Sequence, residues 1–152
     1  MTNTIKISTA TEHDIPALTE LLGLLFSQEA EFQADPAVQQ RSLIELIANP
    51  ALGTILVARR DGEAIAMVSL LFSISTALGG RVAWLEDMIV QPDWRGRGIG
   101  STLLKHAVDH CRSEGLKRIT LLTDGHNLAA QRFYQKHGFS CSAMMPMRCL
   151  LG

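Results

Sequence analysis

Three glycines occupy alternate positions, Gly96, Gly98 and Gly100, between an apolar run and a segment with helical periodicity. The N-terminus of a helix presents N–H groups without helical acceptors and a partial positive charge, and glycines let a bulky anion approach that backbone. Arg95 and Arg97 add positive charge at the same point. We therefore expect a phosphate-binding turn here; the alternative is a tight strand-to-helix connection that merely tolerates glycine.

The spacing of the glycines argues against two common phosphate-binding motifs. A dinucleotide-binding turn requires G-x-G-x-x-G, whereas this chain has G-x-G-x-G. A P-loop requires G-x-x-x-x-G-K-[ST], but Gly96 is followed five positions later by Ser101, and Lys105 lies four positions further on. A dinucleotide-dependent oxidoreductase is therefore a distant alternative.

Two adjacent carboxylates, Glu86 and Asp87, interrupt the otherwise apolar stretch AWLEDMIV at residues 83–90. An ionised carboxylate away from water needs partners or changes its pKa. Successive side chains of a strand point to opposite faces, so we expect that only one of the two needs to face a substrate. The alternative is that one or both lie at a splayed strand end and pair with an arginine or with backbone donors.

The arrangement R-x-x-G-x-G, formed by Arg95, Gly98 and Gly100, resembles the Q/R-x-x-G-x-G/A loop with which the GNAT superfamily of N-acetyltransferases binds the pyrophosphate of acetyl-coenzyme A (acetyl-CoA). A second stretch, NLAAQRFYQKHGF at residues 127–139, resembles the superfamily signature N-x-x-A-x-x-F/L-Y-x-x-x-G-F. The positions that coincide are Asn127, Ala130, Phe133, Tyr134, Gly138 and Phe139. The two motifs indicate the fold and the acyl donor, but they say little about the acceptor.

The resemblance implies a set of cofactor-binding residues. In the superfamily a central strand splays from the next strand, and the pantetheine arm lies in that opening, bonded to backbone that matches Met88, Ile89 and Val90. Asn127 would bond the same arm or cap its own helix. The residues that correspond to the pyrophosphate loop are Arg95, Gly96, Arg97, Gly98, Ile99, Gly100 and Ser101.

The resemblance also implies two catalytic residues. The sequence around Glu86 is similar to that of diamine acetyltransferases, whose corresponding glutamate acts as a base. A protonated amine must lose a proton, directly or through water, before it attacks a thioester. A backbone N–H near Met88 would stabilise the oxyanion that then forms. Tyr134, the only tyrosine of the chain, matches the residue that protonates the leaving thiolate, although a tyrosine on a helix ordinarily serves packing.

Hydrophobic periodicity and turn signals predict the elements of the N-terminal half. A short strand at residues 5–8 precedes a helix with a capping box formed by Thr11 and Asp14. A second helix begins at Pro36 and ends near Asn49. Three apolar runs then predict an antiparallel meander, at residues 54–58, 64–74 and 82–90.

The C-terminal half reads as alternating helices and strands. We expect a helix at residues 99–112, a strand at 118–122, a helix at 127–137 and a final strand at 141–150. Together with the resemblance, these elements predict one α+β domain of the GNAT type over residues 1–152. Its central sheet would be twisted, mostly antiparallel and splayed at the middle, with about four flanking helices.

Composition and charge narrow the class of protein. With 152 residues, 47% of them apolar, the chain suits one folded domain, and a net charge of −1 gives no reason to expect nucleic acid as a partner. No apolar run reaches the roughly 18 residues that cross a bilayer. The three cysteines lack CxxC spacing, which favours reduced thiols in a cytoplasmic protein. His106 and His110 have no third ligand in view, so we expect no metal.

We expect the domain to transfer an acetyl or other acyl group from acetyl-CoA to a primary amine of a small molecule or peptide. The alternative is a CoA-binding sensor without catalysis, which would not need both Glu86 and Tyr134. Glu29, Glu31 and Asp35 could attract a cationic amine, although a solvated run of charges explains them equally well. The sequence leaves the acceptor and the oligomeric state open, a homodimer included.

Overall fold

The computed structural model describes residues 4–29 and 33–152. The chain divides into two compact units, Met1–Leu122 and Thr123–Gly152. The prediction of a single domain over the whole chain therefore stays a prediction. No helix of the described residues is long and apolar enough to cross a membrane.

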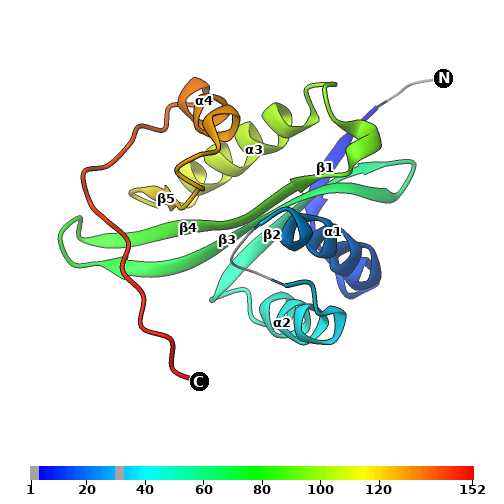
Figure 1. Cartoon of the computed structure of the whole chain (residues 1–152), viewed down its shortest axis with the longest axis horizontal. Coiled ribbons are helices and arrows are strands. Elements are labelled where there is room, and N and C mark those ends of the chain that lie inside the picture. Colours follow the sequence, from blue (N-terminus) through cyan, green and yellow to red (C-terminus); the bar gives the residue numbers. More distant parts are fainter. Residues whose placement is uncertain (1–3, 30–32) are drawn as a thin grey trace. The chain divides into compact units, whose positions relative to one another are not determined.

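The first unit is built on a five-stranded sheet whose strands lie in chain order, β1-β2-β3-β4-β5 (Figure 1). Neighbouring strands are antiparallel up to β4, and β5 runs parallel to β4. The strands are β1 Lys6–Thr9, β2 Gly53–Arg60, β3 Glu63–Ser75, β4 Gly80–Val90 and β5 Ile119–Leu121. The predicted antiparallel meander and the mixed α+β class are thereby confirmed.

Helices cover both faces of this sheet (Figure 1). They are α1 Ile15–Gln28, α2 Pro36–Ala48 and α3 Ile99–Ser113, with short 3-10 turns at Glu12–Asp14 and Pro92–Trp94. Figure 1 shows α1 and α2 on one side of the sheet and α3 on the other. The middle of β3 is buried without alternation over residues 65–70, as expected for a strand covered on both faces.

The core on the α1 and α2 side is aliphatic. Leu18 and Leu22 of α1 and Leu43 of α2 pack in one buried cluster with Val57 and Met67 of the sheet. On the opposite side, α3 buries Leu103, Leu104 and Ala107 completely. These residues recur at helical spacing, so the same periodicity that predicts the helix also fixes the face it turns to the sheet.

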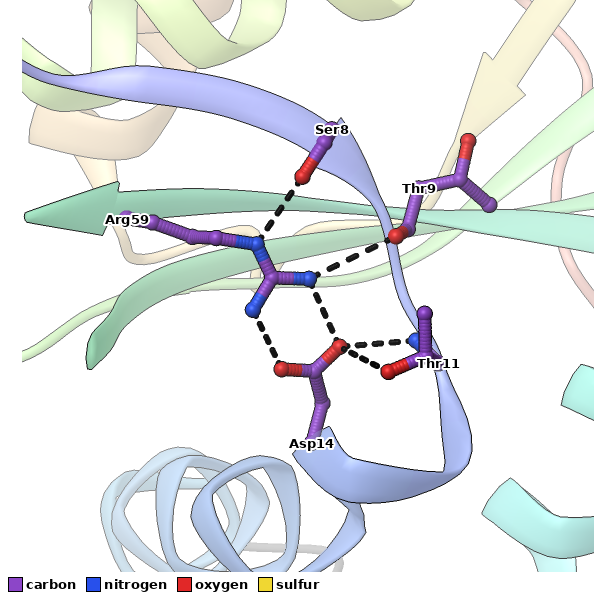
Figure 2. A network of polar contacts seen from close by, with 5 residues as sticks. All are labelled: Ser8, Thr9, Thr11, Asp14 and Arg59. Atoms are coloured by element: carbon purple, nitrogen blue, oxygen red, sulfur yellow. Dashed lines mark hydrogen bonds and ion pairs between the residues drawn. The ribbon is translucent and has the colours of Figure 1, made fainter. Parts of the chain in front are cut away.

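An ion pair holds the start of α1 against the sheet. The guanidinium of Arg59, on β2, donates to both carboxylate oxygens of Asp14 and to the Ser8 hydroxyl at 2.9 Å (Figure 2). Asp14 also accepts the Thr11 N–H at 2.7 Å, the bond expected of the predicted capping pair. The Arg59 hydrogen bond keeps the pKa of Asp14 below its ordinary value against the opposing effect of burial.

The sheet is irregular in the middle of β4. Ser69 pairs with Asp87, but the next residue of β3, Leu70, pairs with Leu85, so Glu86 is left between the two pairs as a β-bulge. On the other edge, β5 pairs only with Ala83, Trp84 and Leu85, whereas β4 continues to Val90. The strand β5 thus ends just before the bulge, and the predicted splay of the two strands stays a prediction.

The second unit contains one helix, α4 Leu128–Lys136, which agrees with the predicted helix at 127–137. The predicted strand at residues 141–150 is wrong: this segment has no regular secondary structure, and all of its residues are exposed. A strand forms only against a neighbour that accepts its backbone hydrogen bonds, and α4 is the only other element of this unit. The apolar residues of this segment were therefore not sufficient to predict a strand.

Candidate active site

A cavity of about 540 Å³ lies in the first unit between α1, α2 and strands β2, β3 and β4. Its size is that of sites that bind small molecules. Most of its wall is apolar and comes from Leu22 and Phe26 of α1, Leu43 of α2, and Met67 and Leu71 of β3. The cavity reaches the bulge of β4, so the irregular part of the sheet forms part of its wall.

Glu86 and Asp87 both line this cavity. The expectation that they occupy opposite faces of the strand is wrong. Strict alternation requires an unbroken ladder, and the bulge inserts Glu86 as an extra residue opposite β3. Two neighbouring carboxylates are therefore brought to one cavity, with Glu86 exposed and Asp87 half-buried.

Asp87 exchanges two hydrogen bonds with Ser69. The Ser69 hydroxyl donates to the Asp87 carboxylate at 3.0 Å, and it accepts the Asp87 N–H at 3.0 Å. Burial raises the pKa of Asp87 to about 6; the Ser69 hydrogen bond opposes this, while the charges of Glu86 and Glu29 add to it. Asp87 therefore changes its protonation state close to neutral pH.

The glycine turn follows β4 directly. Gly96 and Gly98 have positive φ angles of 76° and 79°, and α3 begins at Ile99. A Cβ added at either glycine would meet no atom within 4 Å, so their backbone conformation, rather than crowding, explains the choice of residue. At the start of this helix, the Thr102 N–H donates a hydrogen bond to the Gly98 carbonyl at 3.1 Å. The N–H groups of the first turn of a helix generally point out of its N-terminal end, which is the arrangement that binds anions.

Both arginines of the turn are held by neighbours. The Arg95 Nε donates to the Val90 carbonyl at 3.0 Å, which ties the turn to the end of β4. The Arg97 guanidinium lies 4.6 Å from the centre of the Trp94 ring, and Arg60 lies over the same ring at 4.7 Å. The two arginines of the predicted phosphate-binding turn are thus held by contacts near the end of β4.

Met88, Ile89 and Val90 follow the bulge and pair with β3, opposite Val68, Met67 and Ala66. Their other edge lies beyond the last pair between β4 and β5. An extended arm that adds to a sheet needs such an edge. The predicted arm-binding backbone and the predicted turn are therefore contiguous in one unit.

The two remaining site residues belong to the second unit. The side-chain Oδ1 of Asn127 accepts the Ala130 N–H at 3.0 Å, so the capping role offered for it is observed. Tyr134 is half-buried, and its ring lies 5.2 Å from that of Phe133 and 5.7 Å from that of Phe139. This aromatic cluster fixes the ring of Tyr134 within its unit.

The acidic residues before α2 have different positions. Glu29 lines the cavity, in keeping with a role in attracting an amine. Asp35 instead caps α2, where its carboxylate accepts the Val38 N–H at 3.4 Å. Glu31 lies outside the described residues. Sequence reasoning missed Ser69 and Glu45, which also line the cavity, because a lone serine in an apolar run and a glutamate on a helix carry no distinctive signal.

Comparison with known proteins points to one family. The model of the acetyltransferase (GNAT) family matches residues 15–139. An uncharacterised N-acetyltransferase of Bacillus subtilis, YhfO, is 32% identical over 117 residues, which cover 76% of this chain and 78% of the relative. An aminoalkylphosphonate N-acetyltransferase of Salmonella typhimurium is 28% identical over 88% of this chain and 83% of its own length.

The fold has solved counterparts. A predicted acetyltransferase from Clostridium acetobutylicum, determined with acetyl-CoA, superposes with a TM-score of 0.77 at 19% identity and covers 96% of both chains. This likeness establishes the fold. The narrower resemblance of the Glu86 strand to diamine acetyltransferases stays a prediction.

Proposed function

Since the chain belongs to the acetyltransferase (GNAT) family and is an acyl-CoA-dependent acetyltransferase, we propose that it acetylates a primary amine bound in the cavity beside Glu86 and Asp87. One observation carries this assignment: the bulge brings two carboxylates to the cavity just beyond the last pair between β4 and β5. The strand then leads directly into the glycine turn. Acceptor and donor would therefore meet at the middle of one strand.

The donor side suits acetyl-CoA, which supplies the activated acyl group as a thioester. In this proposal the backbone of the glycine turn and the guanidinium groups of Arg95 and Arg97 hold its pyrophosphate. The edges of Met88, Ile89 and Val90 bond its extended arm, and Asn127, which matches the family signature, bonds the same arm. The open space around Gly96 and Gly98 supports this assignment, because a bulky phosphate can approach there without a clash.

On the acceptor side, Glu86 takes the proton of the bound ammonium group, directly or through one water molecule. Asp87 is the second candidate for this role, because a base is most effective when its pKa lies near the working pH, and that of Asp87 is about 6. Ser69 orients the Asp87 carboxylate through its hydroxyl group. The two carboxylates also make the cavity favourable for the ammonium form before the proton leaves.

The later steps use backbone and phenol groups. A backbone N–H near Met88 stabilises the negative oxygen that develops when the amine adds to the thioester carbonyl. The Tyr134 hydroxyl then donates its proton to the departing thiolate, and the second proton that the nitrogen loses on becoming an amide restores the phenol. The name of the Salmonella relative makes a phosphonate-bearing amine one candidate acceptor. Other candidates are small amines that carry no further charged group, and the amino groups of peptides.

The test is release of CoA from acetyl-CoA across a panel of primary amines. We expect Glu86→Gln to lower kcat about tenfold or more at neutral pH, with a loss that shrinks at alkaline pH, where more of the amine is already free. Binding of acetyl-CoA should remain unchanged. Glu20→Gln is the matched control, because Glu20 is exposed on α1 and does not line the cavity. Equal turnover of Glu86→Gln and the control at every pH would remove Glu86 from the base role.

A further inference from the structure

The charges around the cavity all have one sign among the described residues. Its lining contains four carboxylates, Glu29, Glu45, Glu86 and Asp87, and no lysine, arginine or histidine. They come from the end of α1, from α2 and from β4, so acidic groups surround the cavity from both helices and the sheet. The field inside therefore favours positive charge and opposes negative charge.

The rest of the wall determines what kind of molecule can carry that positive charge. Apolar side chains dominate the lining, and those of Leu43 and Met67 also belong to the buried core cluster. A volume of about 540 Å³ accommodates a body of several carbon atoms. Such a wall gains free energy from burying an aliphatic or aromatic body.

The pKa of Asp87 supports the same conclusion. Glu86 and Glu29 both raise it, so the charge of each of them acts on the Asp87 carboxylate. An ammonium group between them relieves that repulsion, whereas a second anion increases it. The described lining holds no cation that could compensate a carboxylate or phosphonate on the acceptor.

We infer that the acceptor is a cationic amine with an apolar body and without an anionic group. This inference rests on the proposed function, since it concerns the acceptor side of the same site. It separates this chain from an enzyme for amino acids, phosphosugars or aminophosphonates, although a relative is named for the last class. Negatively charged amines would have to bring their charge into a wall of four carboxylates.

Three acceptors of equal chain length test the inference: hexylamine, ε-aminocaproate and aminohexylphosphonate. We expect kcat/KM to be about tenfold or more higher for hexylamine than for either anionic amine, because like charges in an interface are strongly unfavourable. Equal or better use of the anionic amines would overturn the inference and leave the acetyltransferase assignment intact. Failure of all three as acceptors would count against the proposed function instead.

Charge reversal in the wall supplies the matched variants. Glu45 is exposed on α2 and lines the cavity, so Glu45→Lys should fold normally, lower kcat/KM for hexylamine and raise it for ε-aminocaproate, changing their ratio about threefold or more. Glu20→Lys makes the same change on α1 away from the cavity and should leave the ratio unaltered. An identical effect of both variants would mean that net charge, rather than the cavity, sets the preference, and would overturn the inference.

Binding without chemistry gives an independent readout. Hexyltrimethylammonium and heptanoate have the two opposite charges and cannot be acetylated, so calorimetry with them measures the preference of the cavity alone. We expect the cation to bind more tightly, and we expect added salt to weaken its binding. Tighter binding of heptanoate would overturn the inference whether or not any amine is turned over.

Discussion

At the scale of single residues, the proposed chemistry requires the ionised form of Asp87, and this form destabilises the folded protein. Its pKa in the folded chain is about 6, above the ordinary value of 3.8, so the folded state binds the proton more tightly than the unfolded state does. The contribution of this carboxyl group to stability is therefore full below pH 3.8 and is lost as the pH rises to about 6. Above that range the ionised, half-buried group destabilises the protein.

Asp87→Asn should consequently raise the free energy of unfolding at pH 8 by about 2 kcal/mol and by much less at acidic pH. The asparagine carbonyl can still accept the Ser69 hydroxyl, so the packing of the site is kept. Chemical denaturation at two pH values measures the effect. Glu20→Gln is the control, because Glu20 is exposed on α1 away from the cavity, and its neutralisation should leave stability nearly unchanged. A variant Asp87→Asn that is less stable than the parent at pH 8 would contradict the account.

Tyr134→Phe removes one hydroxyl group and keeps the ring between Phe133 and Phe139. If that hydroxyl protonates the thiolate, kcat should fall roughly tenfold to several hundredfold, while the Michaelis constants and the melting temperature change little. Turnover and the melting temperature should be measured on the same preparation of the variant. A fully active variant would show that water or another group supplies the proton.

At the scale of elements, the ion pair of Asp14 and Arg59 connects the start of α1 to β2, and α1 forms one wall of the cavity. The pKa of Asp14 lies below its ordinary value, so its contribution to stability is full above that ordinary value and is lost as the pH falls through the lower, folded value. The pair is mostly withdrawn from solvent, with side-chain exposures of 18% for Arg59 and 8% for Asp14.

Asp14→Asn should therefore cost about 3 kcal/mol at neutral pH, because it leaves a largely buried guanidinium without its partner. The difference from the parent chain should narrow as the pH falls below the ordinary value of 3.8 and through the lower, folded value, because the parent carboxyl group is then protonated as well. Urea denaturation across pH measures this. Asp109→Asn provides the comparison: Asp109 pairs with Lys105 and Arg112 on the exposed side of α3, where its loss should matter far less. Equal losses of unfolding free energy in the two variants would show that burial adds nothing to the contribution of the pair of Asp14 and Arg59.

The elements also show what sequence patterns can and cannot predict. The helix after the glycines and the three strands of the meander are local features, and their periodicity and turn residues predict them within a few residues. The bulge at Glu86 depends on how β4 is paired with β3, which no pattern within β4 records. The strand expected at 141–150 failed for the same reason, because strands need a partner that a local pattern does not contain.

At the scale of the whole molecule, the proposed donor site should couple ligand binding to stability. Acetyl-CoA at about a hundredfold excess over its Kd should add roughly 2.7 kcal/mol to the free energy of unfolding, which corresponds to a rise of several degrees in melting temperature. NAD and ATP lack the pantetheine arm and should raise the melting temperature much less. Thermal denaturation with each ligand in turn measures this. Equal shifts for all three would mean that the turn recognises phosphate alone.

The bulge of β4 has a consequence for the length of the chain. Removing one residue from a strand ordinarily turns every later side chain to the wrong face. Here two successive residues of β3, Ser69 and Leu70, pair with Asp87 and Leu85, so the register of β4 shifts by one residue at Glu86. Deleting Glu86 would bring these two pairs into ordinary succession and leave all other partners in place. The centre of the sheet is thus one residue longer than a regular ladder needs, and that surplus residue is the proposed base.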